Sequence, residues 1–407
     1  MLAQTIAKQA PRALARGLGD SIFRANPDYE LLLLDQLPAE EQKLLCPLRG
    51  DANFFGLIRH STATGLTTKG VSGEAAELFK LLQKPGRLPV ALLGESESEL
   101  IVSRLVYDGI LQVAQGSEWI CGPAACEVET LPLPEDSGRI LAGLSLQAIR
   151  HAASLASADS KDLSSRLYLY NTLPLTPQWL RRIPGGTALE EYLQIQLGGG
   201  CRSELDRDWA RASPEAEQGV WLAWSSRSSP WQRTGVVGYK LYLSALPLHL
   251  RVAFRAWLPA ITAAGAYHFK IGSNARGLLR PDKIVAYFSD RAALEEAAYY
   301  ITKELSGCPS QGVPFTAELN AGALLSWASD PPMEENVPTW LRRQSWRQWI
   351  CFRLGSALAI AKREQSAAIP AWRFALERLR LEGVDVTTWA PGSELWQSKS
   401  DAGVASP

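Results

Sequence analysis

Hydrophobic positions in the first third of the chain recur with two periods and predict strands followed by helices. Residues 54–71, FFGLIRHSTATGLTTKGV, indicate two short strands joined by a polar turn. SGEAAELFKLLQKPG predicts a helix with Ser72 as its N-cap. SESELIVSRLVYDGILQV predicts a second helix that stops at Gly109, and ILQVAQGSEWICG predicts a hairpin that turns near Gln115 and Gly116.

The middle of the chain passes from a proline-rich stretch into helical periodicity. TLPLPEDSGR, from Thr130 to Arg139, predicts a polar linker. ILAGLSLQAIRHAASLA then predicts a helix on which His151 is expected to be partly buried. We interpret SSRLYLYNTLPLTPQWLRRIP as a short apolar strand with a proline-broken turn, and LGGGCRSE as a flexible connection.

Alternating segments separated by helices dominate the second half of the chain. VVGYKLYLSAL predicts a strand in which Lys240, Tyr242 and Ser244 share one face. The predicted helix LHLRVAFRAWLPAITAAG follows. A second strand, AYHFKIGS, then carries His268 and Lys270 together on one face.

A corner, a third strand and a long helix complete this region. The corner RPDK contains Arg280 and leads into KIVAYF, where Lys283 and Tyr287 lie on one side of the predicted strand. DRAALEEAAYYITKEL predicts a helix with Asp290 as its N-cap. Strand lysines often lie on solvated faces or sheet edges, so for each lysine taken alone we favour a structural role over a catalytic one.

Arginine and tryptophan interleave beyond residue 338. TWLRRQSWRQWICFRLGSALAIAK predicts a helix, and we favour the interpretation that its tryptophans pack inward and its arginines point outward. The same letters also fit a surface that binds phosphopeptides, nucleic acid or an acidic partner. Arg343 and Arg353 are then candidates to cover a neighbouring anion site.

Composition and charge narrow the function classes. The chain has 407 residues, 46% hydrophobic and 21% charged, as expected of a globular protein with two or three domains. Lys plus Arg and Asp plus Glu both number 42, and this balance argues against a non-specific nucleic-acid binder. No apolar run has the length of a membrane span, and the N-terminal residues lack the apolar core of a secretory signal. We therefore expect a cytoplasmic protein.

The sequence lacks the familiar local motifs of metal, nucleotide and hydrolase sites. The six cysteines form no paired framework, and CGPAAC has no second Cys/His pair at zinc spacing. LGGGCRSE fits neither a phosphate loop nor a dinucleotide fingerprint, and no GxSxG occurs. We expect buried thiols and no metal or organic cofactor.

The elements together predict an α+β protein in three parts. Residues 1–130 are expected to form a winged-helix or peptide-recognition module. Residues 131–215 are expected to form a helical linker region, and residues 216–407 a mixed-sheet domain with C-terminal helices.

The order of elements in the third part resembles a known lyase fold. The frame is YKLYLSALP, a helix, HFK, LLRPDKIVAYF, a helix and LSGCPSQGVPF, within residues 235–320. It is similar to the phosphothreonine lyases of bacterial effectors and to the lyase domains of class III and IV lanthipeptide synthetases. Related type III effector-like proteins occur in class V lanthipeptide and thioamitide pathways. The resemblance implies a carbon–oxygen lyase that eliminates phosphate from phosphoserine or phosphothreonine.

The resemblance also implies roles for particular residues. The family's base is a lysine on the second strand, and Lys270 looks like it. Lys240 is similar to the family's phosphate-contacting lysine, while Lys283 and Tyr287 look like its third-strand residues. A lysine base must be partly neutral, and His268, Lys240, Lys283 and Arg280 are the expected cationic neighbours that lower its pKa.

The chain departs from the family pattern at the general acid. The family has a histidine two residues after the phosphate-contacting lysine, and this chain has Tyr242. Tyrosine is a weaker acid at neutral pH. Four alternatives stay open: Tyr242 donates the proton, His268 replaces it, cations alone assist the leaving phosphate, or the fold binds a modified peptide without catalysis.

The first part resembles PqqD-like recognition elements, which bind leader peptides in the biosynthesis of ribosomal peptides (RiPPs). VSGEAAELFKLL and LVYDGILQV carry this likeness, and the same elements also fit a DNA-binding winged helix or a structural module. Arg104 is the only base on the second helix, among several carboxylates, which favours peptide over DNA.

Taken together, the two resemblances imply a RiPP biosynthesis protein. It would act as a phospho-Ser/Thr lyase on a precursor peptide of lanthipeptide or thioamitide type, after a separate kinase. The alternative is a non-catalytic, lyase-like partner that presents a precursor peptide to a kinase or another modifying enzyme.

Overall fold

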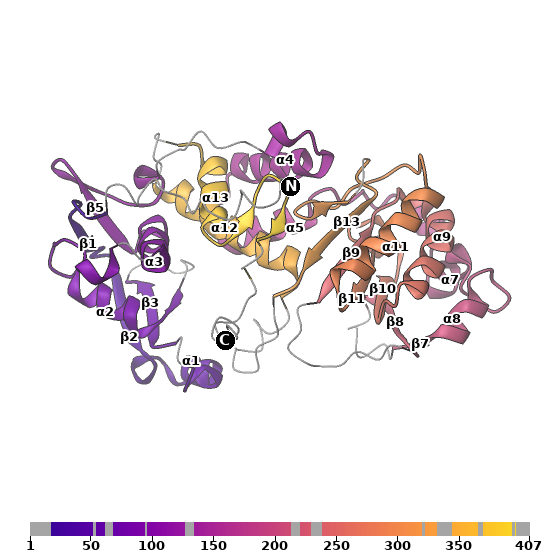
Figure 1. The fold of residues 1–407 in the computed structure, drawn as a ribbon, viewed down its shortest axis with the longest axis horizontal. Helices are drawn as coiled ribbons and strands as arrows, with labels where there is room; N and C mark the ends of the chain where they lie inside the picture. The colour runs from indigo at the N-terminus through magenta and orange to yellow at the C-terminus, as the bar shows by residue number, and fades with distance from the viewer. Residues whose placement is uncertain are drawn as a thin grey trace, which may run out of the picture.

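A computed structural model provides the coordinates. It describes residues 18–51, 54–61, 68–93, 96–126, 134–212, 220–228, 238–319, 322–331, 344–364, 369–392 and 395. The fold is α+β, as predicted, with mixed helices and strands. Figure 1 shows N-terminal strands at one end, a larger sheet at the other, and helices between them.

The N-terminal unit contains two small antiparallel sheets, ordered β1-β5-β6 and β2-β3-β4. Its elements are β1 (Phe23–Ala25), β2 (Tyr29–Leu33), α1 (Ala39–Leu45), β3 (Gly56–His60), β4 (Lys69–Val71), α2 (Gly73–Leu81), α3 (Ser96–Tyr107), β5 (Leu111–Gln115) and β6 (Glu118–Ile120). The Ser72 side chain accepts a hydrogen bond from the amide of Ala75, so the predicted N-cap is confirmed. Gly109 and Gly116 have φ of 78° and 63°, at the predicted helix stop and hairpin turn. The winged-helix assignment stays a prediction.

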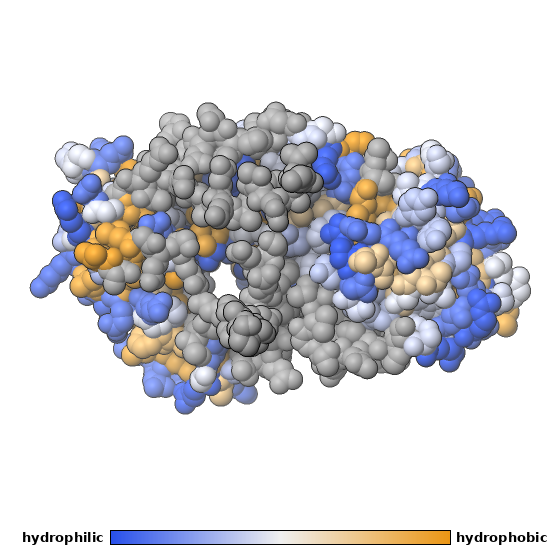
Figure 2. Space-filling view, in the orientation of Figure 1, coloured by the Kyte–Doolittle hydropathy of each residue, from blue (hydrophilic) through white to orange (hydrophobic). Residues whose placement is uncertain are grey.

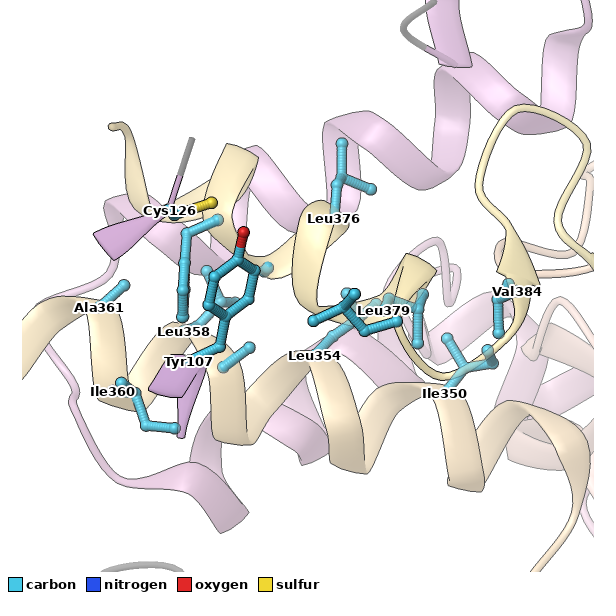
Figure 3. Packing of buried hydrophobic residues seen from close by; sticks show 14 of the residues in the cluster. Tyr107, Cys126, Ile350, Leu354, Leu358, Ile360, Ala361, Leu376, Leu379 and Val384 are labelled. Carbon is cyan, nitrogen blue, oxygen red and sulfur yellow. The ribbon is translucent and has the colours of Figure 1, made fainter. Parts of the chain in front are cut away.

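A helical layer lies between this unit and the larger sheet (Figure 1). It contains α4 (Ile140–Ser154), α5 (Ser160–Leu169), α12 (Trp346–Glu364) and α13 (Ala371–Arg380), followed by the short strands β14 (Val384–Asp385) and β15 (Ala390–Pro391). Figure 3 shows Leu354 and Ile350 of α12 packed beside Leu379 of α13, with Tyr107 of α3 nearby. A Cβ at Gly355 would lie 2.2 Å from the Ser164 Oγ, so only glycine allows α12 to approach α5 this closely.

The helix α5 corrects the strand expected around residues 164–170. Asp159 caps it by accepting a hydrogen bond from the amide of Asp162 at 2.8 Å. Leu163 and Leu167, four residues apart, are both fully buried, which is the spacing of a helix face. The burial predicted for His151 on α4 is also wrong, because that side chain is exposed.

The larger sheet is antiparallel and has seven strands in the order β12-β13-β9-β11-β10-β8-β7. These are β7 (Trp209–Arg211), β8 (Trp221–Ser226), β9 (Tyr239–Leu243), β10 (His268–Gly272), β11 (Ile284–Phe288), β12 (Ala317–Glu318) and β13 (Leu325–Ser329). The helices of this unit are α6 (Pro177–Arg182), α7 (Gly186–Leu193), α8 (Arg202–Asp208), α9 (Leu250–Ala263), α10 (Ala275–Leu279) and α11 (Arg291–Glu304). Asp290 caps α11 through the amide of Ala293, as predicted.

The buried apolar residues form two cores. One lies under α9 and α11 and also takes residues from α7, α8 and β7. The other joins the N-terminal unit to the helical layer and reaches Tyr242 and Val285 of the sheet. The predicted division at residues 130 and 215 stays a prediction.

The outer surface is mixed in character. Orange, hydrophobic residues appear over the N-terminal unit in Figure 2, and Leu44, Leu81 and Val90 are among its exposed side chains. Within the described part of the chain, every helix is too short or too polar to cross a bilayer.

Candidate functional site

One face of the seven-stranded sheet gathers the polar residues of the three predicted strands. Lys270 of β10 and Tyr242 of β9 pair with Val285 of β11 from its two sides. Two residues further along β11, Tyr287 pairs in the same way with His268 and Lys240. Residues paired across antiparallel strands, and residues two apart along one strand, point to the same side. We call this surface, consisting of Lys240, Tyr242, His268, Lys270 and Tyr287, the polar face.

The opposite face of the same strands is apolar and covered by helices. Leu241, Phe269 and Ala286 are fully buried there. Phe269 meets Trp257 of α9 edge to face, with ring centroids 5.3 Å apart. Burying these residues fixes which side of each strand turns away from α9, and so it orients the polar face.

Lys270 is half-buried among aromatic rings. Its Nζ lies 4.5 Å from the centroid of the Trp221 ring and 5.8 Å from that of Tyr287. Trp221 belongs to β8, the strand that pairs with the other edge of β10. The two rings favour a cation between them and hold the lysine stem away from bulk water.

His268 is held by the same neighbours. Its Nδ1 lies 3.3 Å from the Ser225 Oγ, and its ring meets Tyr287 edge to face at 5.2 Å. Either tautomer fits the contact with a hydroxyl, because the serine both donates and accepts. His268 is therefore positioned to exchange a proton at the polar face.

Lys240 is buried and paired, unlike a solvated strand lysine. Its Nζ forms an ion pair with Asp330, and the ammonium lies 5.1 Å from the Tyr287 ring. The other oxygen of Asp330 accepts a hydrogen bond from the amide of Trp346 at 2.8 Å. The pair therefore ties β9 to the start of α12.

Tyr242 is only 3% exposed and belongs to the core that links the sheet to the helical layer. Burial raises the pKa of its phenol well above the ordinary value, and the nearby charge of Asp330 adds to this effect. A phenol with a raised pKa is a poor general acid at neutral pH.

The corner between α10 and β11 carries a charged cluster. The Arg280 Nε and Nη2 donate to the two oxygens of Asp282, both at 2.9 Å. Arg280 Nη2 also donates to the Tyr168 hydroxyl of α5 at 2.8 Å. Arg347 of α12 places its Nη1 2.7 Å from the Asp282 Oδ2. We call Tyr168, Arg280, Asp282 and Arg347 the site cluster.

The site cluster keeps its carboxylate ionised. Burial alone would raise the pKa of Asp282, but the positive charges of Arg347 and Arg280 bring it below the usual range. The charge of Lys270 acts in the same direction. Arg280 also lies 5.1 Å from the Trp221 ring, so Trp221 is shared by Arg280 and Lys270.

Lys283 lies in a neutral, buried environment beside the corner. Its Nζ donates to the Ala245 carbonyl at 3.1 Å and to the Gln311 side chain at 2.6 Å. Burial lowers its pKa to about 7, against the opposing effect of Asp282. Both hydrogen-bond acceptors are neutral oxygens, so Lys283, just before β11, ties the residues after β9 to the Gln311 loop.

Neither of the two arginines predicted to cover the site, Arg343 and Arg353, is seen at the polar face among the described residues. Arg343 lies outside the described residues. Arg353 stacks 3.6 Å from the centroid of the Trp349 ring and lies 3.8 Å from Glu382. These contacts belong to the packing of α12 on the segment after α13, not to the polar face.

The predicted orientation of α12 is partly wrong. Trp346 and Trp349 are buried, as expected. Arg347 is 1% exposed rather than outward, because it pairs with Asp282 and donates to the Tyr168 carbonyl at 2.8 Å.

Several site residues were not found by sequence reasoning. Arg280 and Asp282 lie two residues apart in one corner, and this spacing allows them to pair. The corner motif by itself, however, predicts only a turn. Nothing local predicts the contributions of Tyr168, Trp221 or Arg347, because each comes from a distant element.

Comparison with known proteins gives a faint likeness. No family model matches the chain, and no curated protein does either. An effector protein from Pseudomonas syringae pv. tomato strain DC3000 has 14% identity and a TM-score of 0.39, over 63% of this chain and 98% of the effector. An effector protein from Pseudomonas syringae pv. syringae strain 61 has 14% identity and a TM-score of 0.37, over 62% and 99%. Similarity at this level carries no conclusion about the site or the activity.

Proposed function

We propose that the protein is a carbon–oxygen lyase that eliminates phosphate from phosphoserine or phosphothreonine in a peptide. The observation that carries this proposal is the common face of β9, β10 and β11, where Lys270 lies between aromatic rings and shares the Trp221 ring with Arg280. A base next to a cation is the pair of groups that this elimination needs.

The chemistry follows from that pair. Neutral Lys270 takes the proton from Cα, the C–H electrons form the Cα–Cβ double bond, and the Cβ–O bond breaks with its electrons on the phosphate. Arg280 neutralises the leaving phosphate, and the lysine later returns its proton to water. The cycle begins from the neutral amine of Lys270, because only that form can accept a proton.

Departure of the phosphate does not depend on a proton from Tyr242 in this proposal, because the phenol holds its proton. His268, held by Ser225, is the candidate proton donor, and Arg280 supplies charge in either case. Lys240, paired with Asp330, supports the face rather than delivering a proton.

The substrate of this proposal is a precursor peptide of lanthipeptide or thioamitide type that a separate kinase has phosphorylated. The N-terminal unit would bind its leader segment as an added strand, since β4 and β6 are sheet edges. Arg104 donates to the Leu381 carbonyl, which removes it from phosphate binding and supports peptide over DNA. The cytoplasm is the proposed location.

A non-catalytic peptide-binding protein is the second candidate, and the buried, weakly acidic Tyr242 at the position of the expected acid favours it. The test is incubation with a phosphothreonine peptide, followed by mass spectrometry for loss of phosphoric acid. Lys270→Ala should abolish the loss, and the exposed Lys303→Ala on α11 should not. Binding without elimination would replace the lyase with the second candidate.

A further inference from the structure

The guanidinium of Arg280 has two nitrogens committed and one nitrogen open, and we call the open one the Nη1 edge. Nε and Nη2 donate to Asp282, and Nη2 also donates to Tyr168, which uses the N–H of Nε and both N–H groups of Nη2. In the part of the chain that the structure describes, the two N–H groups of Nη1 have no hydrogen-bond partner. The Arg280 side chain is 19% exposed, so this end is accessible.

Arg347 is the opposite case. Its Nε donates to the Pro314 carbonyl at 3.2 Å, its Nη2 to the Tyr168 carbonyl at 2.8 Å, and its Nη1 lies against Asp282. The side chain is 1% exposed. Arg347 therefore contacts no ligand and acts through Asp282.

The charges of the cluster explain why two arginines share one carboxylate. With Arg280 alone, Asp282 would cancel the positive charge that an anion needs. Arg347 adds a second positive charge, so two cations and one anion leave one net positive charge. A fixed positive group in a site of reduced solvent access attracts an anion more strongly than one in water does.

We propose that Asp282, Tyr168 and Arg347 are positioning residues that hold the Arg280 Nη1 edge ready for the phosphate of a phosphopeptide. Asp282 and Tyr168 fix the orientation of the guanidinium, and Arg347 restores its net charge. Arg280 and Lys270 both lie against the Trp221 ring, at 5.1 and 4.5 Å from its centroid. This inference deepens the proposed function and rests on it for the identity of the anion.

An open Nη1 edge on Arg280 should recognise the phosphate group of a peptide rather than the peptide chain. The two N–H groups of Nη1 can each donate a charge-assisted hydrogen bond to an anionic phosphate oxygen, and a neutral hydroxyl forms a weaker one. Loss of the fixed Nη1 position should therefore weaken binding of a phosphothreonine peptide and leave its unphosphorylated twin unchanged. A residue needed only for folding would weaken both peptides or lower the melting temperature alone.

The test measures the dissociation constants of both peptides with the full chain, in a Lys270→Ala background that prevents turnover. Tyr168→Phe removes the hydroxyl alone, and we expect about tenfold weaker phosphopeptide binding. Tyr299→Phe, on the exposed surface of α11, is the matched control and should change nothing. Arg347→Gln should weaken the phosphopeptide similarly, and Arg347→Gln with Asp282→Asn should recover part of the affinity because the net charge returns.

The outcomes separate this inference from the proposed function. Unchanged phosphopeptide affinity in folded Tyr168→Phe, or an equal loss for both peptides, would overturn the inference even if the wild type eliminates phosphate. Tyr168-dependent phosphopeptide binding by a wild type that never eliminates phosphate would support the inference and overturn the lyase. Tyr168→Phe decides the question even if the Arg347 variants do not fold.

Discussion

Two buried clusters in this protein combine arginine with carboxylates, but we expect them to have different roles. In the first, Arg378 of α13 donates to Asp108 through Nε and Nη2, and its Nη1 donates to Glu382 at 2.6 Å. Lys69 of β4 also pairs with Asp108. We call Lys69, Asp108, Arg378 and Glu382 the joint cluster, because it ties the N-terminal unit to the end of α13.

The difference lies in how many edges of the central arginine meet a carboxylate. Arg378 meets carboxylates on both edges, whereas Arg280 meets one and keeps its Nη1 open. A fully paired buried arginine can only hold structure together. An arginine with one open edge can hold structure and still bind an anion, so we expect substitutions in the two clusters to separate stability from activity.

The largest expected effect is on stability, from Arg378→Ala. This change leaves Asp108 and Glu382 buried without their main partner, and removing one member of a buried pair costs about 3–5 kcal/mol. The free energy of unfolding from urea titration should fall by that amount, while kcat of the remaining folded protein stays the same. Arg87→Ala, at an exposed ion pair, is the control. An unchanged midpoint would show that the joint cluster does not hold the two units together.

Arg280→Ala should have the reverse profile. It removes the open edge and leaves Asp282 paired with Arg347, so we expect elimination from a phosphothreonine peptide to fall about 10²–10³-fold in kcat/KM with a smaller loss of stability. Arg276→Ala, exposed on α10, serves as the matched control. Wild-type kinetics in Arg280→Ala would show that the open nitrogen of Arg280 has no part in elimination.

The sequence predicted the scaffold of the site but not its charged cluster. The strict alternation of YKLYL, HFKIG and IVAYF identified which residues share a face, because one face of each strand had to be buried against α9 and α11. The partner of Asp282 could not be predicted in this way. Arg347 lies more than sixty residues later, on a helix whose periodicity shows a face without showing what that face meets.

The segment RLYLY illustrates a second limit. Its alternating leucines and tyrosines have the period of a strand, yet the cap at Asp159 and the spacing of Leu163 and Leu167 favour a helix. The helix places Tyr168 at the site cluster, so an error in one element concealed a residue of the site.

Lys283 offers a test that depends on pH. Its pKa is lowered from 10.5 to about 7 in the folded protein, so between these values the unfolded chain binds a proton that the folded chain does not. Stability from this group therefore rises with pH in that window, by roughly 1.4 kcal/mol per pH unit, and the full penalty remains below pH 7. Relative to Lys283→Met, wild-type stability should improve between pH 7 and pH 10. The exposed Lys303→Met should show no such trend, and a parallel pH profile for wild type and Lys283→Met would contradict the buried, neutral lysine.

The smallest expected effect is that of Tyr242→Phe. The phenol is a poor acid, so its loss should change kcat for elimination by less than about threefold, well below the effect of losing a general acid. Ser225→Ala, which loosens His268, should change kcat more than Tyr242→Phe does. A hundredfold loss in Tyr242→Phe would restore Tyr242 as the proton donor.

The central claim, that Lys270 removes the Cα proton and phosphate leaves, is tested most directly with a phosphothreonine peptide deuterated at Cα. Elimination yields a dehydrated residue that has lost both the deuterium and the phosphate, and it should be slower than elimination from the undeuterated peptide. Hydrolysis instead yields threonine that keeps its deuterium. Mass spectrometry should find the dehydrated product with wild type and Lys303→Ala, and not with Lys270→Ala. Deuterated threonine, or an unchanged phosphopeptide, with the wild-type protein would contradict the account.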